Sequence, residues 1–587
     1  MRIKRFRRFY PAIAAALVAM AFVPAVSLAA TGGTGASGPG PVRARITGAV
    51  IPGSATTTTT TTTTAATAAA AAPGGGLPTK QAQIKRLTAA LAYMQKHYKT
   101  LAGSTPGVQD IDDYGIGPLW RKGIDGAGTT IAVIEGWNLG NIAQIVAGFD
   151  EQFDLPAPPS LRTIYPAGPL PKTCPPGMVK LGSYGSCDAW GGELALDVVT
   201  AHLIAPYAKI VISATPADTE VKDDPASNVA PPEMMKALEV ISRQHLANVI
   251  SISDGTGETT YSYGRAQILA NSPGELAAAA AGIPVLVATG DCGVVQNLAV
   301  ANGQCADTSA TPDTAAWDDS PWVTAVGGSV PDFSFTAPQR LGPDPLWNIA
   351  GVFSEGAGFS SVFTRPGYAG GVARITGSPM RSVPDITMDA QDGTSEAAPM
   401  LAGVLSLATQ LNGGDIGPIN PVLYRELGPA GARAGIADVV SGNDSVLSNG
   451  KLAVPGFTAG RGFDVASGWG TVYAPRFVPS LVTATKEAGR ERAARQQALD
   501  ELKQLERQGI VLSRTNTGNF YLLASGFLPA HPVRLFIGGK FIARLTANTL
   551  GDVTYMIDPA LLHLARGRHA VTLDSMLIPE AAGFTVG

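Results

Sequence analysis

The sequence predicts an α/β protein with a parallel sheet covered by helices, followed by a small β-sandwich. Short apolar runs rich in β-branched residues recur at 129–137, 208–216, 247–255, 283–293 and 321–329. Ala-rich helical runs separate several of them, at 191–206, 231–246 and 266–282. Strands that are apolar throughout are typical of parallel sheets with both faces covered. Beyond residue 509, apolar and polar residues instead alternate in short runs divided by turn signals, which predicts the sandwich.

The start of the chain predicts an exported protein. Residues 1–30 combine a basic start with an apolar run that ends in small residues, which is typical of a secretory signal peptide. A membrane anchor is the alternative, but the run is short and no second span follows. Residues 31–79 are rich in Gly, Pro, Thr and Ala and predict a disordered linker. Residues 80–108 predict a helix and its lead-in, since apolar residues recur there at helical spacing: Ile84, Leu87, Leu91 and Met94.

Composition narrows the functional classes. The length allows two or three domains, and 45% hydrophobic with 15% charged residues is ordinary for a globular protein. A net charge of -3 gives no reason to expect nucleic acid or an anionic membrane as a partner. Four cysteines in an exported chain predict two disulfides rather than a metal site, because no C-x-x-C motif occurs. The nearest pairings are Cys174–Cys187 and Cys292–Cys305, and the other two connectivities stay open.

Acidic residues gather where a parallel sheet places functional groups. Glu135, Asp254 and Asp291 follow predicted strands, and ligands of such sheets bind at the strands' C-terminal ends. Glu193 and Asp197 stand four residues apart in a predicted helix, so they share one face and favour sharing a proton. The alternatives are a surface pair for Glu193 and Asp197, and an Asx-turn for Asp291.

The turn Gly393-Thr394-Ser395 places the hydroxyl of Ser395 at the start of a predicted apolar helix. Pro399 is expected in the first turn of that helix. Unpaired N–H groups and the helix dipole favour developing negative charge there, although helix capping is the alternative role. A Ser-His-Asp triad needs a histidine base, and none of the six is suitably placed. His202, five residues past Asp197, is expected to face elsewhere. A carboxylate is therefore the expected base.

Four motifs, in this order, resemble the sedolisin family of serine-carboxyl peptidases: ELALD, TGDCG, SPWVTAVGGS before VPD, and DGTSEAAPMLAG. The resemblance covers residues 109–482 and implies a subtilisin-like fold. It also implies roles for the site residues, with Ser395 as the nucleophile, Glu193 as its general base, Asp197 as the residue that orients Glu193, and Asp291 as the oxyanion donor. Glu135 would extend the hydrogen-bond network, and Asp254 stands where relatives often carry an aromatic residue.

The resemblance further implies one structural calcium ion near the end of this domain. Two carboxylates and three backbone carbonyls would bind it, from Asp438, Val439, Gly460, Gly462 and Asp464. Calcium takes six or more oxygen ligands in flexible loops, and glycines let carbonyls turn inward. Without the resemblance, this segment reads as a Gly-rich turn.

The function implied is a secreted, acid-acting endopeptidase with protein or peptide substrates, and tripeptide release from an N-terminus stays open. The alternative is a catalytically silent relative that acts as a surface adhesion or binding protein. Residues 483–508 predict a charged helical connector, and 509–587 an Ig-like β-sandwich. Such modules often bind cell walls, glycans or proteins, and a spacing role fits equally well. We expect a monomer without a membrane span after signal cleavage, a shortened loop before Ser395, and no long prosegment before the catalytic domain.

Overall fold

The computed structural model of the protein describes residues 77–586. Gaps fall at 175–186, 216–231, 262–263, 297–299, 302–303, 306–310, 350–352, 449–450, 489–494, 501–509, 516–517, 525–531, 547–551 and 575–578. The predicted signal peptide and nearly all of the predicted linker lie outside the described residues. The same holds for much of the predicted connector, residues 483–508.

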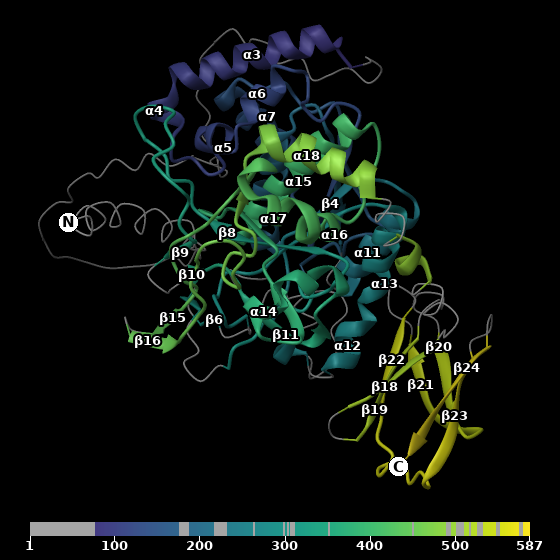
Figure 1. Cartoon of the computed structure of the whole chain (residues 1–587). Helices are drawn as coiled ribbons and strands as arrows, with labels where there is room; N and C mark the ends of the chain where they lie inside the picture. Colours follow the sequence, from purple (N-terminus) through teal and green to yellow (C-terminus); the bar gives the residue numbers. More distant parts are fainter. Residues whose placement is uncertain are drawn as a thin grey trace, which may run out of the picture. The chain divides into compact units, whose positions relative to one another are not determined.

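A seven-stranded sheet forms the centre of the main domain (Figure 1). The strand order is β13-β8-β5-β4-β1-β3-β2, and every neighbouring pair is parallel. The strands are β1 (Thr130–Glu135), β2 (Leu161–Ile164), β3 (Lys209–Ala214), β4 (Val249–Ile252), β5 (Val285–Ala288), β8 (Thr324–Ser329) and β13 (Ile386–Asp389). Five of them match the predicted apolar runs, so the predicted α/β class is confirmed.

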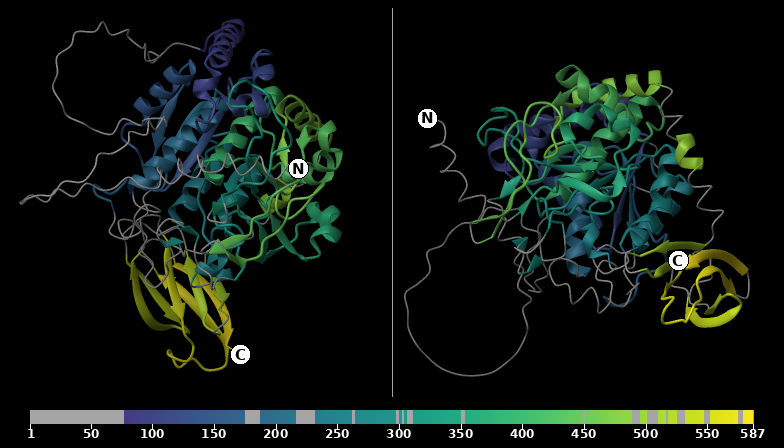
Figure 2. Two further views of the ribbon diagram at one scale, coloured as in Figure 1. Left: turned by 90° about the vertical axis from the view of Figure 1, so that its left-hand side faces the viewer. Right: turned by 60° about the horizontal axis from the view of Figure 1, so that its bottom comes forward.

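Helices cover both faces of the sheet (Figures 1 and 2). Along β1, Ile131 and Val133 pack on the face of α9, whereas Ala132 and Ile134 pack on the face of α11. The first face carries α7 (Ile142–Phe153), α9 (Cys187–Ile204), α15 (Thr394–Asn412) and α18 (Ala474–Ala488). The second carries α11 (Pro232–Arg243), α12 (Arg265–Ala270) and α13 (Ser272–Ala281). Side chains on alternating faces are therefore both buried, which explains strands that are apolar throughout.

From residue 77 onward, four helices precede the sheet: α3 (Lys80–Lys96), α4 (Tyr98–Leu101), α5 (Val108–Asp113) and α6 (Ile116–Trp120). They confirm the helix predicted in this region. Leu87 and Met94 of α3 are buried in the same core as α15 and α18, while Ile84 and Leu91 are half-buried. The N-terminal segment is thus an integral part of the sheet domain.

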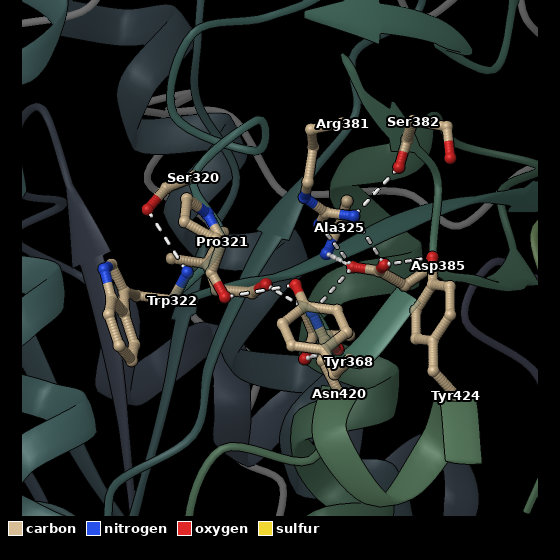
Figure 3. Close-up of polar contacts among 12 residues, drawn as sticks. Ser320, Pro321, Trp322, Ala325, Tyr368, Arg381, Ser382, Asp385, Asn420 and Tyr424 are labelled. Carbon is tan, nitrogen blue, oxygen red and sulfur yellow. Dashed lines mark hydrogen bonds and ion pairs between the residues drawn. The ribbon is translucent and has the colours of Figure 1, made fainter. Parts of the chain in front are cut away.

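A buried ion pair fixes the start of β13 (Figure 3). The guanidinium of Arg381 contacts both carboxylate oxygens of Asp385, at 2.7 and 2.6 Å. The hydroxyl of Tyr424 donates to Oδ1 at 2.7 Å, and the N–H of Ala325 donates to Oδ2 at 2.8 Å. Because Ala325 belongs to β8, these contacts hold β13 in register beside β8. The chain that follows β13 carries Ser395.

Short elements complete the main domain. They are β6 (Val300–Ala301), β7 (Gln304–Cys305), β9 (Asn348–Ile349), β10 (Phe353–Ser354), β11 (Gly358–Thr364), β12 (Met380–Val383), α14 (Ala373–Thr376), α16 (Asn420–Val422), α17 (Gly428–Ala430), β14 (Ile436–Ala437), β15 (Val446–Ser448), β16 (Lys451–Val454) and β17 (Thr471–Val472). Among the described helices, none is both long and apolar enough to cross a bilayer.

Two antiparallel sheets form the C-terminal region, ordered β18-β19-β22 and β21-β20-β23-β24. They comprise β18 (Ile510–Arg514), β19 (Phe520–Ala524), β20 (Pro532–Ile537), β21 (Lys540–Thr546), β22 (Val553–Ile557), β23 (Gly567–Asp574) and β24 (Pro579–Val586). Leu522 from one sheet and Leu535 from the other belong to one buried apolar core. The Ig-like type of this region stays a prediction.

Candidate active site

The serine lies on a tight connection between β13 and α15. Strand β13 ends at Asp389 and α15 begins at Thr394, so only residues 390–393 separate them. Gly393 has φ 91°, in the left-handed region that favours glycine. A Cβ on Gly393 would also lie 2.6 Å from Oδ2 of Asp291. Backbone conformation and space therefore both demand glycine in front of Ser395.

Pro399 lies deeper in α15 than the sequence predicted. It is the sixth residue of the helix, beyond the first turn, because the helix begins at Thr394. A proline there has no N–H for the carbonyl of Ser395, four residues earlier. The hydroxyl of Ser253 lies 3.2 Å from that carbonyl and compensates for the missing donor. It also lies 2.8 Å from Oδ2 of Asp197, so Ser253 connects α15, the helix of Ser395, to Asp197.

Glu193 and Asp197 lie on α9, which packs against α15. The carboxyl of Glu193 lies close enough to the Ser395 side chain for that hydroxyl to act on its pKa. Burial raises the pKa of Glu193 well above its ordinary value, the charge of Asp197 raises it further, and the Ser395 hydroxyl opposes both. Burial raises the pKa of Asp197 to about 7, against the lowering effect of Ser253 and Glu135. The predicted pair is therefore a coupled, buried unit beside the serine.

Two further carboxyls join this group. Glu135, at the end of β1, is fully buried beside Asp197, and neither of its carboxyl oxygens has a hydrogen-bond partner among the described residues. Burial first, and then the charges of Asp197 and Glu193, raise the pKa of Glu135 well above its usual range. Asp254 follows β4 and acts electrostatically on both glutamates, and burial raises its own pKa. The structure thus brings the acidic residues predicted at the strand ends to one place.

Asp291 follows β5 and faces the turn before Ser395. Its Oδ1 accepts bonds from the N–H of Thr394 at 2.9 Å and from the Thr394 hydroxyl at 3.0 Å. The N–H of Gly290 donates to that hydroxyl at 3.0 Å. Burial raises the pKa of Asp291, while the two Thr394 bonds lower it in part. Protonated Asp291 could therefore donate a hydrogen bond beside the serine turn.

His202 takes no part in this group. Its Nε2 lies 2.8 Å from Oδ1 of Asp150 on α7, and its ring is fully buried. His245 likewise pairs with Asp415, at 3.0 Å. The expectation that His202 faces away from Ser395 is confirmed.

The candidate calcium residues share one loop region. Gly462 N–H donates to Oδ2 of Asp438 at 2.9 Å, and Gly460 N–H donates to Oδ2 of Asp464 at 2.7 Å. Oδ1 of Asp438 is buried without a hydrogen-bond partner. An orphaned carboxylate oxygen next to glycine-rich backbone fits a hard cation. Val439, the fifth candidate, is buried beside Asp438.

The disulfide prediction is confirmed for Cys174–Cys187, whose sulfurs are 2.05 Å apart. This bond attaches Cys174 to the first residue of α9, the helix that carries Glu193 and Asp197. Cys292, next to Asp291, is also disulfide-bonded, and the side chain of its predicted partner Cys305 lies outside the described residues.

Sequence reasoning missed Ser253, and it considered Thr394 only as a possible helix cap. Both contribute hydroxyls to carboxyls from distant parts of the chain, Asp197 and Asp291. The signal for Ser253 was Pro399, because a proline inside a helix leaves a carbonyl that needs a donor. The identity of that donor is a long-range contact that no local pattern encodes.

No model of a known protein family matches the chain. The chain is similar to kumamolisin from Bacillus sp. (strain MN-32), with 26% identity over 396 residues that cover 62% of each protein. It is also similar to tripeptidyl-peptidase 1 from Canis lupus familiaris, with 28% identity over 328 residues, covering 50% of this chain and 52% of that protein. The chain thus spans less than two thirds of the length of these relatives.

Among solved structures, Pseudomonas sedolisin, a serine-carboxyl proteinase complexed with two molecules of pseudo-iodotyrostatin, aligns with a TM-score of 0.49 and 21% identity. That alignment covers 62% of this chain and 94% of the other.

Proposed function

We propose, on the premise that the sequence relatives indicate the sedolisin family, that this chain is a secreted serine-carboxyl peptidase that hydrolyses proteins or peptides at acidic pH. The observation that carries the proposal is the buried Glu193–Asp197 pair beside Ser395, in a site where the described histidines are engaged elsewhere or remote. A hydroxyl beside a buried carboxyl that can accept its proton is the arrangement of an activated nucleophile.

Proton transfer in this site would use one shared charge. Asp197 is the first of Glu193, Asp197 and Glu135 to ionise, because Ser253 and Glu135 lower its pKa. When Ser395 attacks a peptide carbonyl, its proton passes to Glu193, and Glu193 returns its own proton to Asp197 along the same helix face. The carboxyls thereby supply a base without the help of a histidine.

Asp291 would stabilise the oxyanion. Both Thr394 donors act on Oδ1, so a proton on Asp291 is best placed on Oδ2, the oxygen nearest Gly393. A protonated carboxyl there donates a hydrogen bond to the developing negative charge. Activity should therefore rise as the Glu193–Asp197 pair loses its first proton and fall as Asp291 ionises. This gives a bell-shaped profile, and the expectation that its centre lies below neutrality comes from the resemblance to the sedolisin family.

One calcium ion would stabilise the end of the domain. Asp438 and Asp464 would supply carboxylate oxygens, and Val439, Gly460 and Gly462 backbone carbonyls. The orphaned Oδ1 of Asp438 supports this assignment. The ion would order the loop and take no part in bond cleavage. We also propose a monomer whose C-terminal region is an Ig-like sandwich that contacts cell walls or glycans, since its two sheets enclose a core of their own.

The test is hydrolysis of denatured casein by the purified protein between about pH 3 and 8, with the products identified by mass spectrometry. We expect an acidic optimum, and a loss on the order of 10⁶-fold for Ser395→Ala, as for a knocked-out serine nucleophile. Internal cleavage products indicate an endopeptidase, and N-terminal tripeptides indicate tripeptidyl release. A folded wild type that cleaves nothing at any pH would instead support the silent binding protein.

A further inference from the structure

Three buried carboxyl groups outside the proposed triad meet beside the turn that carries Ser395. They belong to Asp110 on α5, Asp389 at the end of β13 and Glu396 in the first turn of α15. All three residues are fully buried, and one carboxyl oxygen of each lies within 4.8 Å of the others. We call these residues the Asp110 cluster. It joins the N-terminal segment to both ends of the serine turn.

Backbone N–H groups hold one oxygen of each carboxyl. Gly107 donates to Oδ2 of Asp110 at 2.6 Å, and Asp392 donates to Oε2 of Glu396 at 3.1 Å. Gln391 donates to both oxygens of Asp389, at 3.1 and 3.0 Å. The remaining oxygens, Oδ1 of Asp110 and Oε1 of Glu396, are buried and receive no hydrogen bond from the described residues. Protons on the carboxyls would supply the missing donors.

The Asp110 cluster has acidic surroundings. Asp113 faces it from α5 and Asp392 from the turn, while Asp344, Tyr98 and Tyr114 lie around Asp110 and Asp113. Arg340 is the nearby cation, but it contacts Asp344 at 2.9 Å and Asp113 at 3.2 Å. No described cation forms an ion pair with Asp110, Asp389 or Glu396. Three ionised carboxylates would therefore repel one another without compensation.

Protonation resolves this repulsion. Burial raises the pKa of each of the three carboxyls well above its ordinary value, and the neighbouring carboxylates raise it further. Carboxyl oxygens of Asp110 and Asp389 lie within 4.8 Å of each other, so a proton on one can be shared with the other. Two carboxyls that share a site cannot both ionise cheaply.

We propose that the Asp110 cluster is a proton-dependent clamp that positions the nucleophile turn against the N-terminal segment at acid pH and releases it as the pH rises. Asp110, Asp389 and Glu396 are positioning residues, because they act on Ser395 through the turn. The clamp rests on the proposed function only in that this turn carries the nucleophile. The Thr105 hydroxyl, which donates to Asp392, ties the same two segments together.

The sign of the effect follows from linkage. Groups whose pKa is raised by folding stabilise the folded state below their ordinary pKa, and this stabilisation is lost as the pH rises through the raised pKa. The clamp therefore closes on the acid side and weakens toward neutrality. The alkaline loss of activity then has a second cause besides ionisation of Asp291.

Hydrogen exchange in the Ser395→Ala background tests the clamp without relying on turnover. We expect peptides covering 389–400 to exchange faster at about pH 7 than at about pH 4, after correction for intrinsic rates, by about tenfold for each unit of pKa elevation. Asp110→Asn keeps an oxygen for Gly107 and an amide donor for Asp389, so it should abolish most of that difference. In the active protein, Asp110→Asn should raise the ratio of activity at pH 7 to activity at the optimum.

Glu275→Gln is the matched control. Glu275 lies on α13, is fully buried, and burial raises its pKa to about 8, but it has no place in the cluster. Its variant should alter overall stability at neutral pH and leave the exchange of 389–400 dependent on pH. Glu396→Gln, which keeps an oxygen for Asp392, is the second variant if Asp110→Asn does not fold.

Several results would overturn the proposal. One is exchange of the turn that is independent of pH in the Ser395→Ala protein, whether or not the wild type is active. Another is protection at neutral pH that returns on adding calcium and disappears in Asp110→Asn, because the three carboxyls would then be a cation site. A protein with the expected exchange but without peptidase activity would contradict the proposed function and leave the clamp standing.

Discussion

The two ends of β13 carry buried carboxyls in opposite electrostatic settings. Asp385, just before the strand, receives both nitrogens of Arg381 and bonds from Tyr424 and Ala325 (Figure 3). Asp389, the last residue of the strand, lies beside Asp110 and accepts a hydrogen bond from Gln391. Both aspartates are fully buried. At one end of the strand, Arg381 neutralises the charge of Asp385. At the other end, the charge of Asp389 is removed only by protonation.

This contrast separates architecture from regulation. An ion pair with arginine persists at every pH at which the protein is folded, since arginine stays charged. It therefore suits the end of β13 that fixes the strand in the sheet. A carboxyl cluster responds to pH, and it lies at the end that leads to Ser395. The first two of the four experiments that follow probe this division, and the other two test the proposed site, from the largest expected effect to the smallest.

Arg381→Met should destabilise the protein at neutral pH by about 3–5 kcal/mol, because it leaves the buried Asp385 carboxylate without a cation. Urea unfolding in the Ser395→Ala background measures this. The double variant Arg381→Met/Asp385→Asn should recover part of the loss.

Asp389→Asn provides the opposite end of the comparison. Because folding raises the pKa of Asp389, its stabilising contribution is lost as the pH rises, and the amide does not suffer that loss. The variant should be more stable than the wild type near pH 7, with a smaller gain in acid. A loss of stability equal to that of Arg381→Met at both pH values would remove the distinction between the two ends.

Asp291→Ala should lower turnover at acid pH by about 10²–10³-fold, the usual cost of removing one oxyanion donor. Asp291→Asn keeps a neutral donor at every pH. Because burial raises the pKa of Asp291 and the wild type loses its donor above that pKa, the asparagine variant should keep more of its activity toward neutral pH. Steady-state rates from about pH 3 to 8 decide this. An alkaline optimum with an almost silent alanine variant would exclude the carboxyl mechanism.

Removal of calcium should have the smallest effect. Chelation should lower the melting temperature. The free energy of unfolding should fall by about 2.7 kcal/mol if the free ion had been at 100 times its Kd. Asp464→Ala should melt like the chelated wild type and respond no further to chelator. Calorimetry and metal analysis of the same samples provide the readout. An identical melting curve with and without chelator, in protein that contains no metal, would argue against the site.

The sequence predicted much of the fold because its signals are local. Apolar runs identified five of the seven strands, since strands buried on both faces leave a continuous pattern. The other two gave weaker patterns. Strand β2 lies at the sheet edge and is only partly buried, and β13 mixes Thr387 and Asp389 with its two apolar residues. The loop at Gly470 covers the outer edge of β13, through a bond from Thr387 N–H to its carbonyl.

The candidate site was predictable where its geometry is short-range. Glu193 and Asp197 share a helix face by spacing alone, and Ser395 lies at a helix start that glycine marks. The Asp110 cluster gave no such signal, because Asp110 and Glu396 come together only through the packing of distant segments. Ser253 is similar: its role depends on a carbonyl that Pro399 frees on another element.

The connection between β13 and α15 has a mechanical consequence. Only residues 390–393 link the strand to the helix, so the position of Ser395 is tightly tied to that of the sheet. A displacement of β13 therefore moves Ser395 by nearly the same amount. Each residue inserted there adds up to about 3.3–3.6 Å of reach, and with it the freedom of the hydroxyl to wander from its carboxyl partner. The length of this connection therefore limits how far Ser395 can move from Glu193. A series of insertions should lower the proposed activity step by step without changing any group that takes part in the chemistry.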